Sequence, residues 1–255
     1  MSATLRKKSE ARKKRLFQQA RRIAKRLANA SQAERPVPMM TASNIHYEPA
    51  GRARGLSAGG IGAILLLARY VGLIEQIDRE LHLLKRHVPY HESDHVLNIA
   101  FNILAGGERL EHLELRRNDE VYLDALGAER IPDPTTEGDF CRRFSVSDVL
   151  TLMEVINGAR LRVWAQQPAE FFDTATIDAD GTMVPTDAEC KLGIDVNHKG
   201  VWGYHPLLIS LANTAEPLYL VNRSGNRPSH EQAPAYLNKA IDLCREAGFR
   251  RINWV

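Results

Sequence analysis

The sequence has few cysteines and no long hydrophobic run, and both absences narrow the class of protein. Its three cysteines, Cys141, Cys190 and Cys244, lie far apart and form no Cys-x-x-Cys pair. Neither a disulfide framework nor a thiolate zinc site is therefore indicated, and a reducing cytosol is the simplest compartment. The longest apolar run, GGIGAILLLA at residues 59–68, has about half the length of a bilayer span. It predicts a buried helix and no membrane segment.

The charge of the chain is unevenly distributed. With 44% hydrophobic and 25% charged residues, the composition is that of an ordinary globular protein with a net charge of +3. Residues 1–30 hold eleven of the 34 basic side chains but only one of the 31 acidic ones, Glu10. The rest of the chain is therefore net acidic, and the positive charge belongs to an N-terminal arm.

The arm has helical periodicity, because Leu16, Ala20, Ile23 and Leu27 fall on one stripe. Three interpretations are open: a grip on DNA phosphates, a solvated tail, or an organellar transit peptide. The DNA-binding interpretation assigns the phosphate contacts to all eleven basic residues of the arm: Arg6, Lys7, Lys8, Arg12, Lys13, Lys14, Arg15, Arg21, Arg22, Lys25 and Arg26.

The chain divides into four stretches by composition and periodicity. A basic helical arm (1–35) precedes a linker rich in Pro, Gly, Ser and Asn (36–60). Residues 61–168 are helix-prone, and residues 169–255 have strand patterns. In the helical region, Ser93 or Asp94 and Ser147 or Asp148 are expected to cap helices, whereas Pro132 and Pro134 are expected to break the chain.

Residues 169–255 predict an α/β order. FFDTATIDAD alternates as a strand does, with Thr174, Thr176, Asp178 and Asp180 on one face. A polar connection of about 20 residues follows, and PLLISLAN and PLYLVNR then form a hairpin. SHEQAPAYLNKAIDLCREAGF is an amphipathic helix, and the closing RRINWV reads as a strand that can lie parallel beside the first.

The segment HESDH, residues 91–95, matches the His-Glu-x-x-His pattern of zinc proteases. That chemistry needs both histidines on one face of an established helix, with the glutamate as general base. Pro89 lies shortly before His91, and Ser93-Asp94 is a helix-starting pair. The two histidines are therefore expected to lie on either side of a helix boundary. A zinc hydrolase that uses His91, Glu92 and His95 remains a remote alternative.

Asp178 and Asp180 are the strongest candidates for chemistry. They lie one residue apart at the end of a predicted strand, and Gly181 and Thr182 follow. Carboxylate oxygens suit a hard divalent cation, which would also remove the repulsion between two like charges. Gly181 lacks a Cβ, so a phosphate backbone can approach. The alternative is a strand that ends in an Asp-Gly turn with solvated acids, and these residues alone do not decide between the two.

Six motifs, taken in order, resemble the DDE transposases of bacterial insertion sequences. They are ESDHVLNIAFNILAGG, LEHLELRRND, DPTTEGDFCRRF, TIDADGT, GYHPLL and NRSGN. The resemblance covers about residues 90–255 and excludes the basic arm. It implies a fold class of α + α/β, in which a helical DNA-binding region (61–168) precedes the first half of a ribonuclease-H-like mixed sheet (169–255).

The resemblance also implies a function. In this family, two aspartates and a glutamate hold two Mg²⁺ or Mn²⁺ ions that drive DNA cleavage and strand transfer. Carried over, the first aspartate is Asp180, with Asp178 as a supporting residue. The second aspartate and the glutamate belong beyond Val255, so the chain is expected to be a C-terminally truncated fragment that is inactive alone.

Double-stranded DNA at the element's terminal repeats is the implied partner, with a second copy of the chain as a further candidate. The expected location is the bacterial cytoplasm at the nucleoid, with no membrane. A different interpretation is a non-catalytic DNA-binding protein that competes with an intact transposase.

Overall fold

The computed structural model describes residues 14, 17–22, 24–25, 28, 36–44, 58–188, 191–228 and 230–255. The chain forms two compact units: unit 1 comprises residues 1–62 and 82–142, and unit 2 comprises residues 63–81 and 143–255. The two units are therefore interleaved in sequence, whereas composition predicted consecutive domains.

Unit 1 is helical in its described part. It contains α4 (Glu92–Leu104), a 3-10 turn η1 (Leu110–His112), α5 (Leu113–Arg117), α6 (Glu120–Leu126) and α7 (Pro134–Cys141). Residues 36–44 form bends and a turn that pack against these helices, with Met39 and Met40 buried. The buried apolar side chains of the helices include Leu97, Phe101, Leu113, Tyr122, Leu126 and Phe140.

Two predicted helix caps were wrong. Helix α4 begins at Glu92 with His91 as N-cap, and Asp94 is the third helical residue. Helix α8 (Val146–Trp164) likewise has Ser145 as N-cap and Asp148 as its third residue. In both capping boxes the acid reaches back to the N-cap backbone, so an acid expected outside the helix lies inside its first turn.

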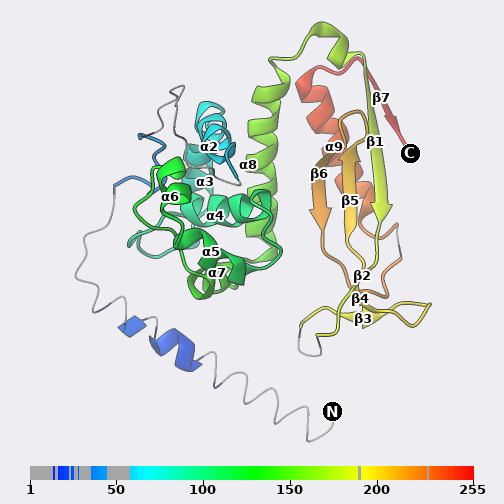
Figure 1. Ribbon diagram of the computed structural model, residues 1–255. Helices are drawn as coiled ribbons and strands as arrows, with labels where there is room; N and C mark the ends of the chain where they lie inside the picture. Colours follow the sequence, from blue (N-terminus) through cyan, green and yellow to red (C-terminus); the bar gives the residue numbers. More distant parts are fainter. Residues whose placement is uncertain are drawn as a thin grey trace, which may run out of the picture. The chain divides into compact units, whose positions relative to one another are not determined.

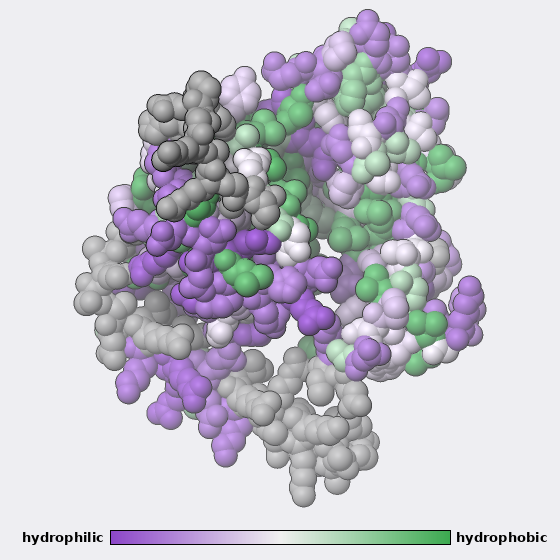
Figure 2. Space-filling model, viewed as in Figure 1, coloured by the Kyte–Doolittle hydropathy of each residue, from purple (hydrophilic) through white to green (hydrophobic). Residues whose placement is uncertain are grey.

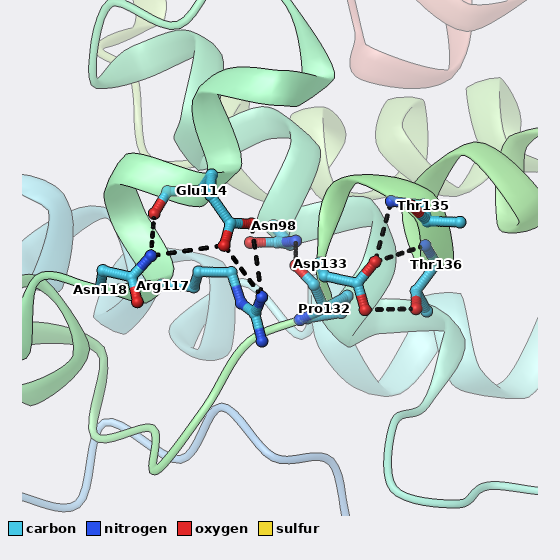
Figure 3. Close-up of polar contacts among 8 residues, drawn as sticks. All are labelled: Asn98, Glu114, Arg117, Asn118, Pro132, Asp133, Thr135 and Thr136. Atoms are coloured by element: carbon cyan, nitrogen blue, oxygen red, sulfur yellow. Dashed lines mark hydrogen bonds and ion pairs between the residues drawn. The ribbon is translucent and has the colours of Figure 1, made fainter.

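The break predicted at Pro132 and Pro134 is confirmed, because residues 127–133 lie outside any helix, and α7 begins at Pro134 itself. Proline suits the first helical position, where its missing N–H needs no partner. Asp133 caps the helix: its Oδ1 accepts from Thr135 N (2.9 Å) and Thr136 N (3.0 Å), and its Oδ2 accepts from Thr136 Oγ1 (2.9 Å), as Figure 3 shows. Pro134 therefore marks the end of the irregular connection and the start of the next helix.

Unit 2 combines helices with a sheet. Gly72, at φ 66°, separates α2 (Ile61–Tyr70) from α3 (Leu73–Glu80), where a single helix-prone stretch was predicted. Helix α3 packs on α8, and Arg162 Nη2 donates to Gln76 Oε1 at 2.7 Å. The short 3-10 helix η2 (Ala169–Phe172) leads into the first strand.

The main sheet of unit 2 has four strands in the order β6-β5-β1-β7. They are β1 (Thr174–Gly181), β5 (Leu207–Leu211), β6 (Glu216–Val221) and β7 (Arg251–Trp254). Strand β5 pairs antiparallel with both β1 and β6, and β7 pairs parallel with β1. These pairings confirm the predicted hairpin and the predicted parallel strand, so the chain combines helices with a mixed sheet.

One face of this sheet forms the core of unit 2. Helix α9 (Ala233–Ala247) covers it, as Figure 1 shows. The buried side chains of this core are Trp164, Ala175, Ile177, Leu207, Ile209, Leu211, Leu218, Tyr219, Ala240, Leu243, Cys244 and Phe249. The apolar stripe predicted for α9 is thus confirmed.

The opposite face of the sheet is less buried. It carries the exposed carboxylates of Asp178 and Asp180 on β1, while Leu220 on β6 is 53% exposed. Figure 2 shows hydrophobic and polar residues intermixed over the sheet. This face is therefore the one on which functional side chains are accessible.

A second, three-stranded sheet lies within the segment that was predicted as a polar connection. Its strands are β2 (Val184–Pro185), β3 (Asp195–Val196) and β4 (Trp202–Tyr204), in the order β2-β4-β3. Both pairings are antiparallel. In the part of the chain that the structure describes, no helix is both long and apolar enough to cross a membrane.

Candidate metal site at the end of strand β1

Strand β1 carries the two candidate carboxylates on its accessible face. Ala175 and Ile177 are fully buried in the core, whereas Asp178 and Asp180 are exposed. The alternation of side chains along a strand therefore aims both acids away from the core, as predicted. Their Cα atoms lie two residues apart, roughly 6.6 Å along a strand.

The neighbouring strands define the surroundings of the pair. On β5, Ser210 lies opposite Asp178 and Leu208 lies opposite Asp180. On the other side, Ala179 N donates to Val255 O at 3.3 Å, which extends the parallel pairing with β7 towards Asp180. Asp180 is therefore at the carboxyl end of a strand that has a neighbour on each side.

Asp180 is the second-last residue of β1, which ends at Gly181. Gly181 N donates to Asp180 Oδ1 at 2.7 Å, and Thr182 N donates to Pro206 O at 3.2 Å. A Cβ placed on Gly181 would lie 2.9 Å from His205 Nε2 and 2.9 Å from Arg223 Nη2. Because real Cβ contacts are longer, only glycine fits at this position without a displacement of its neighbours.

The donor set of this pair suits a hard cation. Both side chains are carboxylates that water can reach, and Mg²⁺ prefers carboxylate oxygens and retains several waters. Among the described residues, however, no group of three or more His, Cys, Asp or Glu side chains is arranged to hold a metal. The two aspartates therefore stand as a pair.

A cleft of about 660 Å³ opens beside the end of β1. Its lining includes Gly181 and the basic side chains of His198, Lys199, His205 and Arg227. The sequence alone predicted no role for these four residues. Two of the quoted motifs point to part of the group: GYHPLL contains His205, and NRSGN ends one residue before Arg227.

The HESDH segment has a different role. His91 is the N-cap of α4 and His95 lies inside the helix, so the two histidines do lie on either side of the helix start, as predicted. Glu92 accepts from Leu83 N (2.9 Å) and Leu84 N (2.8 Å), and its Oε2 lies 3.0 Å from His87 Nε2. The carboxylate that a zinc protease would use as a base is therefore engaged in holding a loop.

His95 and Asn98 also make structural contacts inside unit 1, both with Glu137. His95 Nδ1 lies 3.0 Å from Glu137 Oε2, and Asn98 Nδ2 donates to Glu137 Oε1 at 2.6 Å. Burial raises the pKa of Glu137, and the hydrogen bond and charge of His95 oppose that rise. Asn98 Nδ2 also donates to Pro132 O at 3.2 Å, which ties α4 to the start of α7 (Figure 3). These contacts make the segment a buried polar hub of unit 1.

Four of the predicted DNA-binding residues, Lys14, Arg21, Arg22 and Lys25, are described and exposed. Arg21 lies over the ring of Phe17, with its Cζ 5.8 Å from the ring centroid. Exposed basic side chains are available to phosphates. The other seven lie outside the described residues: Arg6, Lys7, Lys8, Arg12, Lys13, Arg15 and Arg26.

Comparison with known proteins gave no relative. No protein-family model, curated protein or solved structure matches the chain. The residues themselves, and the resemblance that their motifs carry, are therefore the basis on which a function can be proposed.

Proposed function

We propose that this protein acts in DNA transposition as a DDE-type transposase in which Asp180 is the first metal-holding carboxylate. The observation that carries this proposal is the place of Asp180. It is exposed at the carboxyl end of β1, on the face opposite the core. The next residue, Gly181, lies close to the side chains of His205 and Arg223. The resemblance assigns the first aspartate of the family to the end of the first strand.

The sheet supports the same proposal. In a ribonuclease-H-like domain of this family, three strands, a helix and a fourth strand follow one another, as β1, β5, β6, α9 and β7 do here. The order β6-β5-β1-β7 gives β1 a neighbour on each side, and β7 is parallel to it. A carboxylate that follows β7 would therefore lie near Asp180 across the parallel pair.

The chemistry follows from this placement. When bound, two divalent ions activate the attacking oxygen and stabilise the leaving oxygen during in-line displacement at phosphorus. Asp180 and Asp178 would bind one cation with their exposed oxygens, and Mg²⁺ or Mn²⁺ suits that donor set. Asp180 Oδ1 already accepts from Gly181 N, which fixes the carboxylate at the end of the strand. The exposed basic residues of the arm would bind the phosphates of duplex DNA.

A cleavage assay tests the proposal. By the resemblance, residues 1–255 hold only the first of the three acids, so the assay uses a chain extended past Val255 by the C-terminal half of an intact DDE transposase. Metal-dependent nicking of a supercoiled plasmid is expected from the extended chain and is expected to vanish in its Asp180→Ala variant. The 255-residue chain is expected to show none, because two ions about 3.5–4 Å apart need more than one pair of acids.

Two outcomes would contradict the proposal. Nicking by the extended chain that survives Asp180→Ala would remove Asp180 from the chemistry. DNA binding by an extended chain that nicks under no metal condition would favour the non-catalytic DNA-binding protein instead. The zinc hydrolase has no support from the contacts of HESDH, since Glu92 and His95 hold other parts of unit 1.

A further inference from the structure

The cleft beside Asp180 brings basic side chains from three separate segments together. His198 and Lys199 come from the turn between β3 and β4, His205 from the entry to β5, and Arg227 from the turn after β6. Among the described residues that line the cleft there is no aspartate or glutamate. A concave surface with this composition favours an anion.

His205 is held in a defined orientation within the cleft. Its Nδ1 lies 2.9 Å from Arg227 O, and a carbonyl oxygen can only accept, so Nδ1 carries a hydrogen. Its Nε2 lies against Gly181, since a Cβ there would approach this atom to 2.9 Å. The free ring nitrogen therefore lies next to the residue that follows Asp180.

Arg223 fixes the frame of the cleft. It is 5% exposed, and its Nε donates to His205 O at 2.9 Å. Its Nη1 donates to Pro228 O (3.2 Å) and Glu231 O (2.7 Å), while His205 N donates to Arg223 O at 2.9 Å. The guanidinium thus ties the entry to β5 to the loop that carries Arg227. Arg223 is a positioning residue, because its donors serve backbone carbonyls.

The charges in the cleft are only partly neutralised. Arg227 Nη1 lies 3.5 Å from Glu231 Oε1, a distance at the long end for an ion pair. Lys199 has no ion-pair partner among the described residues, and its side chain is exposed. Asn226, another lining residue, donates to Asp195 Oδ2 at 2.5 Å and so holds the turn. An anion in the cleft would meet at least one unneutralised cation.

We propose that this cleft binds a phosphate of the DNA backbone next to the phosphate that Asp180 addresses. Lys199 and Arg227 supply the charge, and the ring of His205 lines the edge nearest Asp180. The inference rests on the proposed function, which puts the reacting phosphate at Asp180. The carboxylates that bind the cations and the basic residues that bind the neighbouring phosphate would then lie side by side. The DNA strand would be held on both sides of the reacting phosphate.

The test is the salt dependence of binding between the full 255-residue chain and a 20-base-pair duplex. Each phosphate contact contributes about −0.9 to the slope of log K against log salt. The double variant Lys199→Ala/Arg227→Ala is expected to make the slope shallower by up to about 1.8. The matched control is Lys239→Ala/Arg245→Ala, which removes the same two residue types from exposed ion pairs on α9 and is expected to keep the slope.

A second measurement reports on His205 directly. Its ring signals in a histidine-selective NMR spectrum, assigned with His205→Gln, are expected to move when the duplex is added and to stay fixed in the double variant. Inorganic phosphate at constant ionic strength is the companion probe. A ring that responds to inorganic phosphate and not to the duplex would overturn the assignment to DNA, as would equal slopes for the cleft variant and the control.

The outcomes separate this inference from the proposed function. If Asp180→Ala abolishes nicking in the extended chain but the cleft variant keeps the wild-type slope, the cleft proposal is wrong and the function stands. If the cleft variant loses slope and no extended chain nicks DNA, the function is wrong and the cleft remains a phosphate site.

Discussion

Asp94 is a buried carboxylate whose replacement should weaken unit 1 strongly. It is 1% exposed, and three backbone donors point at it. Oδ2 accepts from Met39 N (2.8 Å) and His91 N (2.9 Å), and Oδ1 accepts from Met40 N (3.0 Å). Asp94→Asn keeps the shape but turns one oxygen into an NH₂ group. The single amide oxygen can serve the two donors of Oδ2, so Met40 N would face another donor.

The expected cost follows from those contacts. A hydrogen bond to a charged group contributes roughly 1.5–3 kcal/mol, and a buried donor without a partner costs roughly 1–3 kcal/mol. One lost bond and two weakened ones give an expected loss of about 2–4 kcal/mol in the free energy of unfolding. That is a large share of the roughly 5–15 kcal/mol that holds a typical domain folded.

The assay is urea unfolding followed by circular dichroism, together with amide hydrogen exchange at Met39 and Met40. The matched control is Asp148→Asn, because Asp148 occupies the same position in the capping box of α8 but is only half-buried, within reach of water. Water can replace its partners, so its loss should be clearly smaller. Equal losses for the two variants, or unchanged exchange at Met39 and Met40 in Asp94→Asn, would show that these bonds do not hold residues 36–44 in place.

Three further outcomes are expected. Gly181→Ala should destabilise unit 2 by roughly 1–3 kcal/mol and shift the ring signals of His205, because the new Cβ would lie 2.9 Å from that ring; unchanged urea unfolding and unchanged signals would contradict the close approach. Cys141 should react with a thiol reagent well before Cys244, because Cys244 is buried and burial raises its pKa to about 11; mass mapping of the modified native protein checks the order, and equal rates would refute it. Deletion of residues 1–30 should weaken binding to any duplex and flatten its salt slope by about 0.9 per lost phosphate contact; an unchanged slope would identify the arm as a passive tail.

The main sheet was predictable because its signals are local. Alternation along residues 174–180 separated Ala175 and Ile177 from the two aspartates, and the structure keeps that separation. The hairpin and α9 follow from the same kind of pattern. The three-stranded sheet was missed because strands of two or three residues are too short to show a period.

Helix starts were harder to predict, because a capping box contains two polar residues that both resemble a cap. In residues 91–95, Ser93 and Asp94 looked like the start, yet His91 is the N-cap. Pro134 was ambiguous in the same way, since proline both ends and begins helices. The sequence shows that a helix begins near these polar residues, but it does not show which of them is the N-cap and which lies in the first turn.

The candidate site was predictable only in its acidic part. Asp178 and Asp180 are separated by one residue in sequence, so a strand is enough to place them on one face. The basic part consists of Lys199, His205 and Arg227, which tertiary structure brings to one cleft from three segments. No local pattern connects residues so far apart. Their grouping depends on the buried contacts of Arg223 with the backbone.

The location of a bound divalent metal tests the central assignment most directly. Paramagnetic Mn²⁺ broadens the backbone resonances of residues close to it. Two carboxylates should bind the ion only weakly, at millimolar levels, because tight binding needs more protein ligands. Broadening centred on residues 179–182 is expected, and Asp180→Ala should abolish it while Asp148→Ala should not. Broadening centred on residues 91–95, or broadening at 179–182 that survives Asp180→Ala, would contradict a metal site at the end of β1.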